Sequence, residues 1–303
     1  MRILVTGATG FVGQVVVKQL LDQKFEVVIL TRNIPKAAII LGNKCKYFQW
    51  ADTNELAPKE AFEGVDGVVN LMGENIGGRK WSLEQKKMIY NSRIDGTRRL
   101  IDTISTLTHK PSVFVSASAI GVYGSRGPEE LNENSSLGND FLAHVCKDWE
   151  HEALRAQEFG LRVGIIRTGI VLGRNGGVLN RMLPIFKKGL GGPMGEGNQF
   201  MSWIHIDDLA AMYIEVLTNK SISGVHNGTA PYPATNTDFT KALGKVLKKP
   251  TAFRAPRFVL KSALGEMSTL VLDGQKVLPS KFKTENFRYR YPTLDMALKE
   301  TAY

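Results

Sequence analysis

The first 170 residues repeat one pattern, in which a short apolar run is followed by a segment with apolar positions three and four residues apart. The runs have the length and Val/Ile content of buried strands, whereas the spaced positions are typical of amphipathic helices. Strands that alternate with helices predict a doubly wound α/β fold with a parallel sheet. Ser82 and Gln85 form a capping box at the start of the longest helical region, where each side chain is expected to bond the other's backbone N–H. The predicted strands are residues 3–5, 25–30, 46–50, 65–71, 112–116 and 162–167.

This alternation stops near residue 170. Closely spaced glycines from Gly173 to Gly197 predict an irregular, loop-rich segment, and loops of that length tend to be functional. Residues 203–217 then lead into another helix. Short helices broken by Pro250, Pro256 and Pro279 follow, and they predict a smaller C-terminal lobe over the open edge of the sheet.

A glycine-rich turn, Val5-Thr6-Gly7-Ala8-Thr9-Gly10-Phe11-Val12-Gly13, joins the first strand to the first helix. Glycine lets the backbone approach a phosphate, and the helix N-terminus offers free N–H groups and a partial positive charge. In this strand–turn–helix context the Gly-x-x-Gly-x-x-Gly spacing predicts a dinucleotide-binding domain of the Rossmann type. The expected contacts are Thr6, Gly7, Thr9, Gly10, Phe11, Val12 and Gly13.

The end of the second strand predicts which dinucleotide binds. NAD-binding domains usually carry an acidic residue there for the ribose 2′-hydroxyl, and NADP-binding domains carry a cation for the 2′-phosphate. The chain has Arg32 and Asn33 at this point and no nearby Asp or Glu. Arginine binds phosphate in a bidentate manner. The sequence therefore favours NADP(H) over NAD(H), although Asn33 could bond an unphosphorylated ribose.

Composition narrows the remaining classes. The 303 residues are 43% hydrophobic and 22% charged, as in ordinary globular proteins, and no run approaches the roughly 20 apolar residues of a membrane helix. A strand that starts at residue 3 leaves no room for a signal peptide, and two isolated cysteines predict neither a disulfide framework nor a metal site, so we expect a cytoplasmic protein. Residues 241–303 hold 13 Lys or Arg and 5 Asp or Glu, but these charges are scattered, which favours a solvated basic face over nucleic-acid binding.

Several further segments resemble one known family. The opening turn and Trp203-Ile204-His205-Ile206-Asp207-Asp208-Leu209-Ala210 look like the extended branch of the short-chain dehydrogenase/reductase superfamily. Residues 116–124, 145–150, 264–267, 274–279 and 291–294 resemble its atypical YfcH-like (SDR39U1-like) epimerase subgroup, which carries a small C-terminal domain. The resemblance spans nearly the whole chain. We expect a dinucleotide-binding domain of residues 1–170, to which 204–227 return, and a substrate-side lobe of 171–203 and 228–303.

The resemblance implies a Tyr-x-x-x-Lys pair and an upstream Ser as catalytic groups. Ser118 matches the Ser and Lys147 the Lys, but Ala143 stands where the tyrosine belongs. Four residues could replace that proton donor: Tyr123 after the fifth strand, Glu74 after the fourth, or His144 and Cys146 on the helix of Lys147. A fifth alternative is that no side chain replaces it.

Position along the fold predicts the remaining contacts. Asp52 is expected at the adenine, and Ser92 and Arg93 lie on the helix beside the cofactor. The other expected cofactor contacts are Asn70, Leu71, Met72, Gly73, Ser116, Lys147, Arg167, Thr168, Gly169 and Ile170. The substrate is expected near residues 73–81, with Arg79 and Trp81 foremost, and near Met194, Phe200, Ser202 and Trp203.

These observations predict an NADP-dependent oxidoreductase or epimerase that acts on a small carbonyl or hydroxyl compound, which could resemble a nucleotide sugar. The alternative is an NADP-binding sensor or scaffold without turnover, which the missing tyrosine favours and the retained Ser118 and Lys147 disfavour. Nucleic-acid and membrane partners are not expected. The chain is expected to be a monomer or a homodimer.

Overall fold

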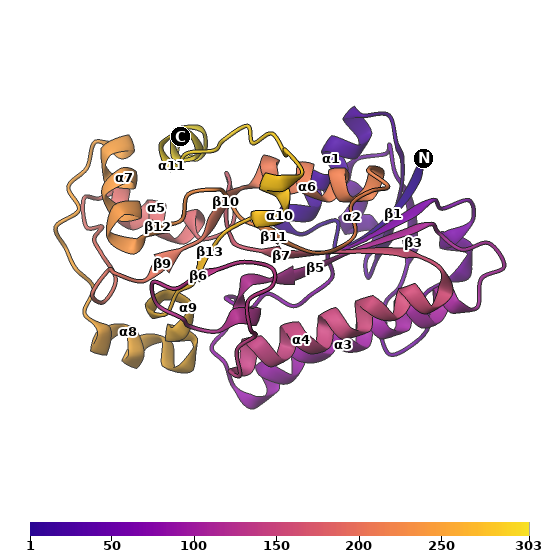
Figure 1. The fold of residues 1–303 in the computed structure, drawn as a ribbon, viewed down its shortest axis with the longest axis horizontal. Helices are drawn as coiled ribbons and strands as arrows, with labels where there is room; N and C mark the ends of the chain where they lie inside the picture. The colour runs from indigo at the N-terminus through magenta and orange to yellow at the C-terminus, as the bar shows by residue number, and fades with distance from the viewer. Residues whose placement is uncertain (303) are drawn as a thin grey trace.

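The computed structural model describes residues 1–302, and its centre is a parallel seven-stranded sheet (Figure 1). The strand order is β11-β7-β5-β4-β1-β2-β3, so the order reverses between β1 and β4. At such a reversal the loops at the carboxyl ends of the two strands diverge and leave a crevice for a ligand. The strands are β1 (Arg2–Thr6), β2 (Glu26–Thr31), β3 (Lys46–Gln49), β4 (Gly67–Asn70), β5 (Val113–Ala119), β7 (Arg162–Thr168) and β11 (Gly224–Gly228).

Helices cover both faces of the sheet. Figure 1 shows α3 (Leu83–Ser105) and α4 (Phe141–Leu154) side by side below it and α1 (Phe11–Asp22) with α6 (Ile206–Thr218) above it. Each layer buries its own apolar cluster against the strands. The predicted doubly wound α/β fold is thus confirmed. The short elements of this part are α2 (Ile34–Leu41) and the 3-10 helices η1 (Lys59–Phe62), η2 (Ile120–Tyr123) and η3 (Arg155–Phe159).

The predicted capping box is only half correct. Ser82 is the N-cap of α3, and its hydroxyl accepts a bond of 3.1 Å from the Gln85 N–H. The Gln85 side chain does not return the bond, because the Ser82 N–H donates to the Lys80 carbonyl at 3.0 Å. The Gln85 amide instead donates to Glu74 at 3.5 Å. Gln85 therefore joins α3 to the loop after β4.

The segment from Gly173 to Gly197 is more regular than predicted. It contains α5 (Leu179–Lys187), which buries Leu179, Met182 and Phe186 although Pro184 lies inside it. The glycines on both sides of α5 hide this helical periodicity. The neighbouring short strands are β8 (Ile170–Leu172) with β10 (Trp203–His205), and β9 (Phe200–Met201) with β12 (Ala234–Thr235).

The C-terminal segment covers the β11 edge of the sheet, as expected. His226 in β11 bonds Glu285 at 3.0 Å, and α10 packs beside that strand. β13 (Lys276–Val277) pairs with β6 (Glu130–Leu131). The division of the chain into two lobes at the bounds given above stays a prediction. The remaining elements are α7 (Asn236–Leu247), α8 (Arg257–Leu264), η4 (Gly265–Ser268), α9 (Thr269–Leu272), α10 (Ser280–Thr284) and α11 (Leu294–Thr301).

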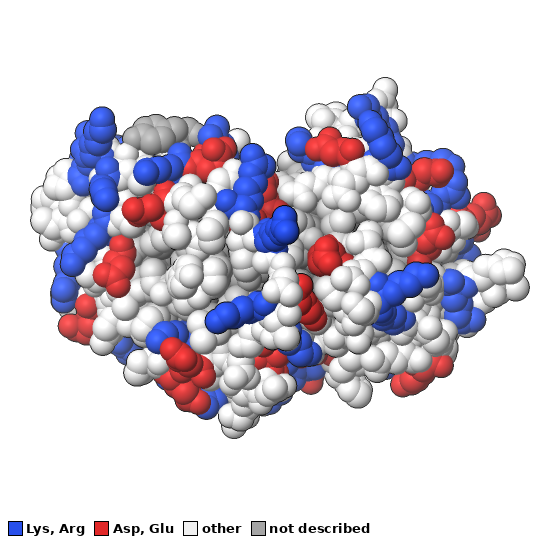
Figure 2. All heavy atoms as spheres, turned by 45° about the horizontal axis from the view of Figure 1, so that its top comes forward, with Lys and Arg blue, Asp and Glu red and all other residues white. Residues whose placement is uncertain are grey.

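Two surface properties bear on possible partners. On the face shown in Figure 2, Lys and Arg are interspersed with Asp and Glu and form no continuous basic patch. Within residues 1–302 no helix is both long and apolar enough to cross a membrane.

Candidate functional site

The glycine turn holds the start of α1 against the end of β4. Gly7 has a φ of +64°, and a Cβ there would lie 2.4 Å from the Leu71 carbonyl oxygen, so only glycine fits. Gly10 is the N-cap of α1, with no side-chain cap and no acidic residue in the first turn. The first N–H groups of the helix are therefore open to an anion.

A cavity of about 370 Å³ lies over this turn and extends across the carboxyl ends of β2 and β4. It combines the open helix N-terminus with a cation from β2 and a carboxylate from the loop after β4. Its walls are Thr6, Gly7, Ala8, Thr9, Gly10, Ile29, Leu30, Thr31, Arg32, Trp50, Ala51, Asp52, Thr53, Leu71, Met72, Gly73, Glu74 and Ser92.

One end of the cavity lies between Arg32 and Asp52. Arg32 is exposed, and its guanidinium forms no hydrogen bond or ion pair with any residue from 1 to 302. The Asp52 carboxylate accepts two 2.8 Å bonds from Asn54. Asn33 lies just outside, where it caps α2 by accepting a bond from the Lys36 N–H. Arg32 is thus the group at this end that is free to bind an anion.

Beneath the cavity, a buried chain of polar groups joins the strands. Thr6 donates to Asn70 at 2.7 Å, and Asn70 donates to Thr97 at 2.9 Å and to Ser116 at 3.3 Å. Asn70 and Ser116 are buried completely. They support the ends of β1, β4 and β5, so their expected cofactor contact would have to pass through Thr6, which does line the cavity.

The loop after β4 forms the opposite wall. The Ser92 hydroxyl accepts a 2.9 Å bond from the Glu74 N–H and donates to the Ile89 carbonyl, which fixes Glu74 against α3. Leu71, Met72 and Gly73 complete this wall. Glu74 is half-buried and is the only predicted catalytic group that lines the cavity.

Ser118 and Tyr123 belong to a buried network around Arg167 and Glu150. Arg167 donates two 2.8 Å bonds to Glu150, which also accepts a 2.6 Å bond from Ser118. Tyr123 accepts a bond from Arg167 and donates to Asn227 at 2.8 Å. Burial disfavours the Arg167 charge, but the bond to Glu150 raises its pKa above the ordinary value.

This network leaves little of the predicted catalytic Ser available. The exposed fractions of Ser118, Tyr123 and Arg167 are 2%, 0% and 4%. Burial also raises the pKa of Tyr123, although Arg167 opposes that shift. The predicted roles of these residues stay predictions, and in this structure their polar atoms are occupied by one another.

The positions on α4 differ sharply in accessibility. Ala143 is fully buried, so no side chain enters the cleft where the tyrosine is expected. Lys147 is half-buried and forms no hydrogen bond or ion pair with residues 1–302. His144 is exposed and bonds the Asp140 carbonyl, and burial raises the pKa of the Cys146 thiol to about 12. Lys147 is therefore the group of α4 that is free to reach a ligand.

Two predicted cofactor segments also serve the fold. Thr168 to Ile170 leaves the sheet toward β10, and a Cβ on Gly169 would lie 2.3 Å from the Ser202 carbonyl oxygen. The Phe11 ring packs against the backbone of Gly173 and Gly176. Phe11 can therefore contribute only its backbone to the cradle.

The predicted substrate-side residues divide into two groups. Trp81 stands over Phe141 at 5.5 Å, and Lys86 pairs with Glu266 beside them, which joins α3 to η4. Arg79 lies in the same loop and is exposed. In contrast, Ser202 and Trp203 are core residues that bond backbone carbonyls, while Met194 and Phe200 are half-buried.

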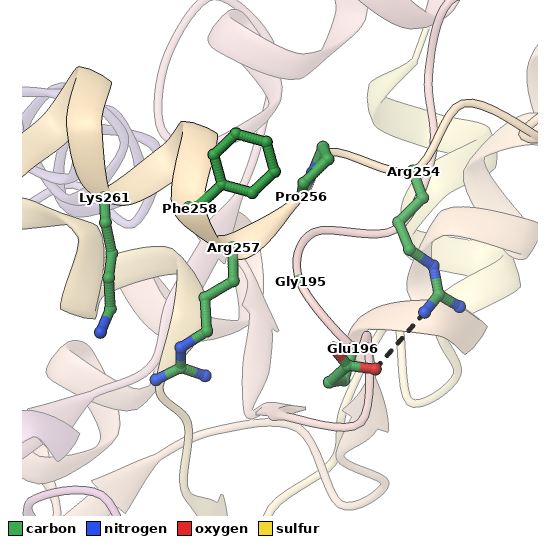
Figure 3. A pocket seen from close by; sticks show the side chains of 7 residues that line it. All are labelled: Gly195, Glu196, Arg254, Pro256, Arg257, Phe258 and Lys261. Carbon is green, nitrogen blue, oxygen red and sulfur yellow. Dashed lines mark ion pairs between the residues drawn. The ribbon is translucent and has the colours of Figure 1, made fainter.

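A second hollow of about 550 Å³ lies in the C-terminal lobe between α8 and the loop of Gly195. Figure 3 shows Arg257 and Lys261 on one side of it and Arg254 facing Glu196 on the other. The Arg254 guanidinium and the Glu196 carboxylate are 3.6 Å apart. It is wide and open, and its cations are partly neutralised by neighbouring carboxylates, since Arg257 also faces Asp273. It shares no residue with the cavity over the glycine turn.

Sequence reasoning missed several groups that the structure brings to the site. Trp50 lines the cavity, and Glu150 and Asn227 hold the buried network. Glu150 carries one signal, because it lies one helical turn after Lys147 between buried apolar positions. The sequence predicts only that Arg93 lies beside the cofactor, and in the structure it lies one turn from Ile89 on the inner face of α3.

Comparisons with known proteins agree with this architecture. The NAD dependent epimerase/dehydratase family matches residues 3–227, and a domain of unknown function (DUF1731) matches residues 255–301. The chain therefore belongs to the NAD dependent epimerase/dehydratase family.

Within that family its relatives are SDR39U1 proteins, so the predicted membership of an atypical extended short-chain dehydrogenase/reductase group is confirmed. The Arabidopsis thaliana epimerase family protein SDR39U1 homolog is 43% identical over 99% of this chain and 86% of that protein. The Mus musculus SDR39U1 protein is 35% identical over 99% of both chains. The crystal structure of human SDR39U1 (isoform 2) with NADPH superposes with a TM-score of 0.90 at 33% identity, covering 100% of this chain and 99% of that one.

Proposed function

We propose that the protein binds NADP(H) over the glycine turn and acts as an oxidoreductase or epimerase on a small carbonyl or hydroxyl compound. The carrying observation is Arg32, which lines the cavity beside the open N-terminus of α1 and has no partner among the described residues. A free arginine suits a 2′-phosphate, whereas a bare ribose is usually held by a carboxylate. The NADPH in the human SDR39U1 structure supports the same choice, and NAD(H) is the weaker candidate.

The proposed division of labour follows accessibility. A bound nicotinamide supplies or accepts the hydride. Glu74 exchanges a proton with the substrate, because it lines the cavity. Lys147 holds the nicotinamide ribose, because it is half-buried and has no partner among residues 1–302. Ser118 and Tyr123 are weaker candidates, since their hydroxyl protons are donated to Glu150 and Asn227.

The remaining expectations are part of the proposal. Asp52 lies at the adenine, and residues 168–170 pass near the nicotinamide amide. The substrate, which could be a nucleotide sugar, enters between Trp81 and η4. The buried free thiols of Cys45 and Cys146 suit a reducing cytoplasm. A monomer or homodimer is expected.

A panel of aldehydes, ketones and nucleotide sugars, followed by NADPH absorbance, tests turnover. We expect Lys147→Ala and Glu74→Gln each to lower kcat/KM by about 100-fold or more, the range of a lost acid–base or positioning group. Lys18→Ala removes an exposed lysine of α1 and should leave the rate unchanged. Full activity in both cleft variants would contradict the assigned roles.

The second candidate is an NADP-binding sensor or scaffold without turnover. The observation that favours it is the complete burial of Ala143 together with the occupied hydroxyls of Ser118 and Tyr123. The same panel separates the two, because the sensor binds NADPH and oxidises none of it with any substrate.

A further inference from the structure

Arg93 lies on the inner face of α3 and forms no ion pair with any residue from 1 to 302. It lies four residues after Ile89 and four before Thr97, both of which are buried on the inner face of α3. Its guanidinium stacks over Trp149 of α4, with 5.2 Å between the carbon and the ring centroid. Burial lowers the pKa of Arg93 below its ordinary value, which records how poorly the surroundings solvate the charge.

Most of its donors are unused. A guanidinium has five N–H groups, and among residues 1–302 Arg93 donates one 3.0 Å bond, to the Ile89 carbonyl. No carboxylate of the described chain lies within ion-pair distance of it, and Glu74 acts on its charge only from farther away. Arg167 and Arg162 are different, since Arg167 is paired with Glu150 and Arg162 donates to three backbone carbonyls.

The guanidinium reaches the wall of the cofactor cavity. A Cβ on Gly73 would lie 2.8 Å from the central carbon of the Arg93 guanidinium and 2.9 Å from one of its nitrogens. Gly73, Glu74 and Ser92, which surround that point, all line the cavity. Arg93 also keeps part of its surface exposed, so its free donors can reach a ligand.

We propose that Arg93 binds an oxyanion of the ligand at the inner end of the cleft, between Gly73 and α4. A desolvated cation is costly without a counter-charge, and a planar fork with free donors fits a phosphate or carboxylate. This inference rests on the proposed function, because it takes the cavity to be a ligand site. Two sources share this chemistry: the diphosphate of the cofactor, and a phosphate or carboxylate of the substrate.

The test compares the wild type with Arg93→Gln and Arg93→Lys. Arg99→Gln, on the same helix and 44% exposed, controls for loss of one positive charge. Calorimetric titration with NADPH reports the whole cofactor, whereas adenosine 2′-monophosphate carries the 2′-phosphate without any part of the diphosphate and so reports the Arg32 end alone. Thermal shifts with inorganic phosphate, with and without saturating NADPH, report a separate anion site.

If the oxyanion belongs to the cofactor diphosphate, Arg93→Gln weakens NADPH binding by about 10- to 100-fold, the range for a charge-assisted bond, and leaves the binding of adenosine 2′-monophosphate unchanged. If the oxyanion belongs to the substrate, Arg93→Gln binds NADPH normally, but phosphate no longer raises the melting temperature of the NADPH-bound variant. Arg93→Lys keeps the positive charge but loses the planar guanidinium, so we expect it to bind the same anion with an affinity between those of the wild type and Arg93→Gln. It replaces Arg93→Gln in the test if that variant does not fold.

Wild-type responses to NADPH and phosphate in both Arg93 variants would overturn the inference. Failure of the proposed function is distinct, since the wild type itself would then not bind NADPH. In that case phosphate binding to the cofactor-free protein decides on Arg93 alone. A phosphate shift that is present in the wild type and absent in Arg93→Gln supports it, and equal or absent shifts in both reject it.

Discussion

The candidate site has two unlike halves. Residues from Gly7 to Arg32 present backbone N–H groups and one free cation to the cavity, whereas the side chains of the Ser118–Arg167 network are buried and bonded to one another. In the first half, glycines shape the turn and no side chain caps the start of α1, so the first N–H groups of that helix stay free to bind a ligand. In the second half, Glu150 accepts bonds from both Ser118 and Arg167. The first half is therefore open to a ligand, whereas the hydroxyl groups of the second half are already hydrogen-bonded to protein.

The largest effect is expected from removing the Glu150–Arg167 ion pair in the second half. Glu150→Gln leaves Arg167 buried with no counter-charge, and we expect it to lower the free energy of unfolding by about 3–5 kcal/mol. Asp22→Asn removes one partner of the exposed Lys18 pair and should cost less than about 0.5 kcal/mol. Urea denaturation measures both, and similar small losses would mean that the buried network is not a constraint.

The first half is broken most directly at Gly7. Gly7→Ala forces a Cβ into the Leu71 carbonyl at a positive φ. We expect this to lower the free energy of unfolding by about 2–4 kcal/mol and also to weaken NADPH binding. Gly127→Ala has a φ of +59° but no atom within 4 Å of the new Cβ, and should cost only about 1 kcal/mol. Urea denaturation and NADPH titration of both variants check this. Equal effects would mean that the close approach of residue 7 to the Leu71 carbonyl is not what requires glycine.

His205 offers a contrast with the Ser118–Arg167 network, because it is also buried but is not fully hydrogen-bonded. Its Nε2 has no hydrogen-bond partner among the described residues, and burial lowers its pKa to about 4. Below about pH 6.5 the His205 imidazole is protonated in the unfolded chain, whereas in the folded protein it stays neutral until about pH 4. Stability therefore falls across that window, by up to about 2–3 kcal/mol from this residue.

Unfolding free energies measured from pH 7 to pH 4.5 test this effect. His205→Gln removes the titrating group and should flatten the pH dependence, even though it also loses the bond from the Asp207 N–H. His144→Gln, at an exposed histidine, should retain the wild-type slope. An unchanged slope in His205→Gln would assign the acid sensitivity to other groups.

The same contrast explains what the sequence could predict. Six strands of the sheet, the glycine turn and the position of Arg32 follow from local patterns, since a strand, a turn and a helix are contiguous in the chain. The seventh strand, β11 at Gly224–Gly228, was not predicted. The α5 helix was missed because glycines on both sides interrupt its periodicity. The predicted bond from the Ser82 N–H to the Gln85 side chain was wrong because that N–H donates to the Lys80 carbonyl.

The catalytic half depends on contacts between distant segments. Tyr123 meets Asn227 across 104 residues, and Ser118 meets Glu150 across 32. No local pattern reports which of these hydroxyls is free, so a motif match at Ser118 does not reveal that its proton is already donated. Arg93 shows the converse limit, since only the fold shows that it forms no ion pair with a carboxylate of residues 1–302.

The central claim is that the 2′-phosphate of NADP(H) binds Arg32, and paired calorimetric titrations of NADPH and NADH test it most directly. We expect the wild type to bind NADPH at least about 10-fold more tightly, and Arg32→Ala to weaken NADPH by about 10- to 100-fold while NADH changes little. Stability should not change, because Arg32 is exposed and unpaired in the described chain. NADH binding as tight as NADPH in the wild type, or equal losses of both in Arg32→Ala, would contradict the account.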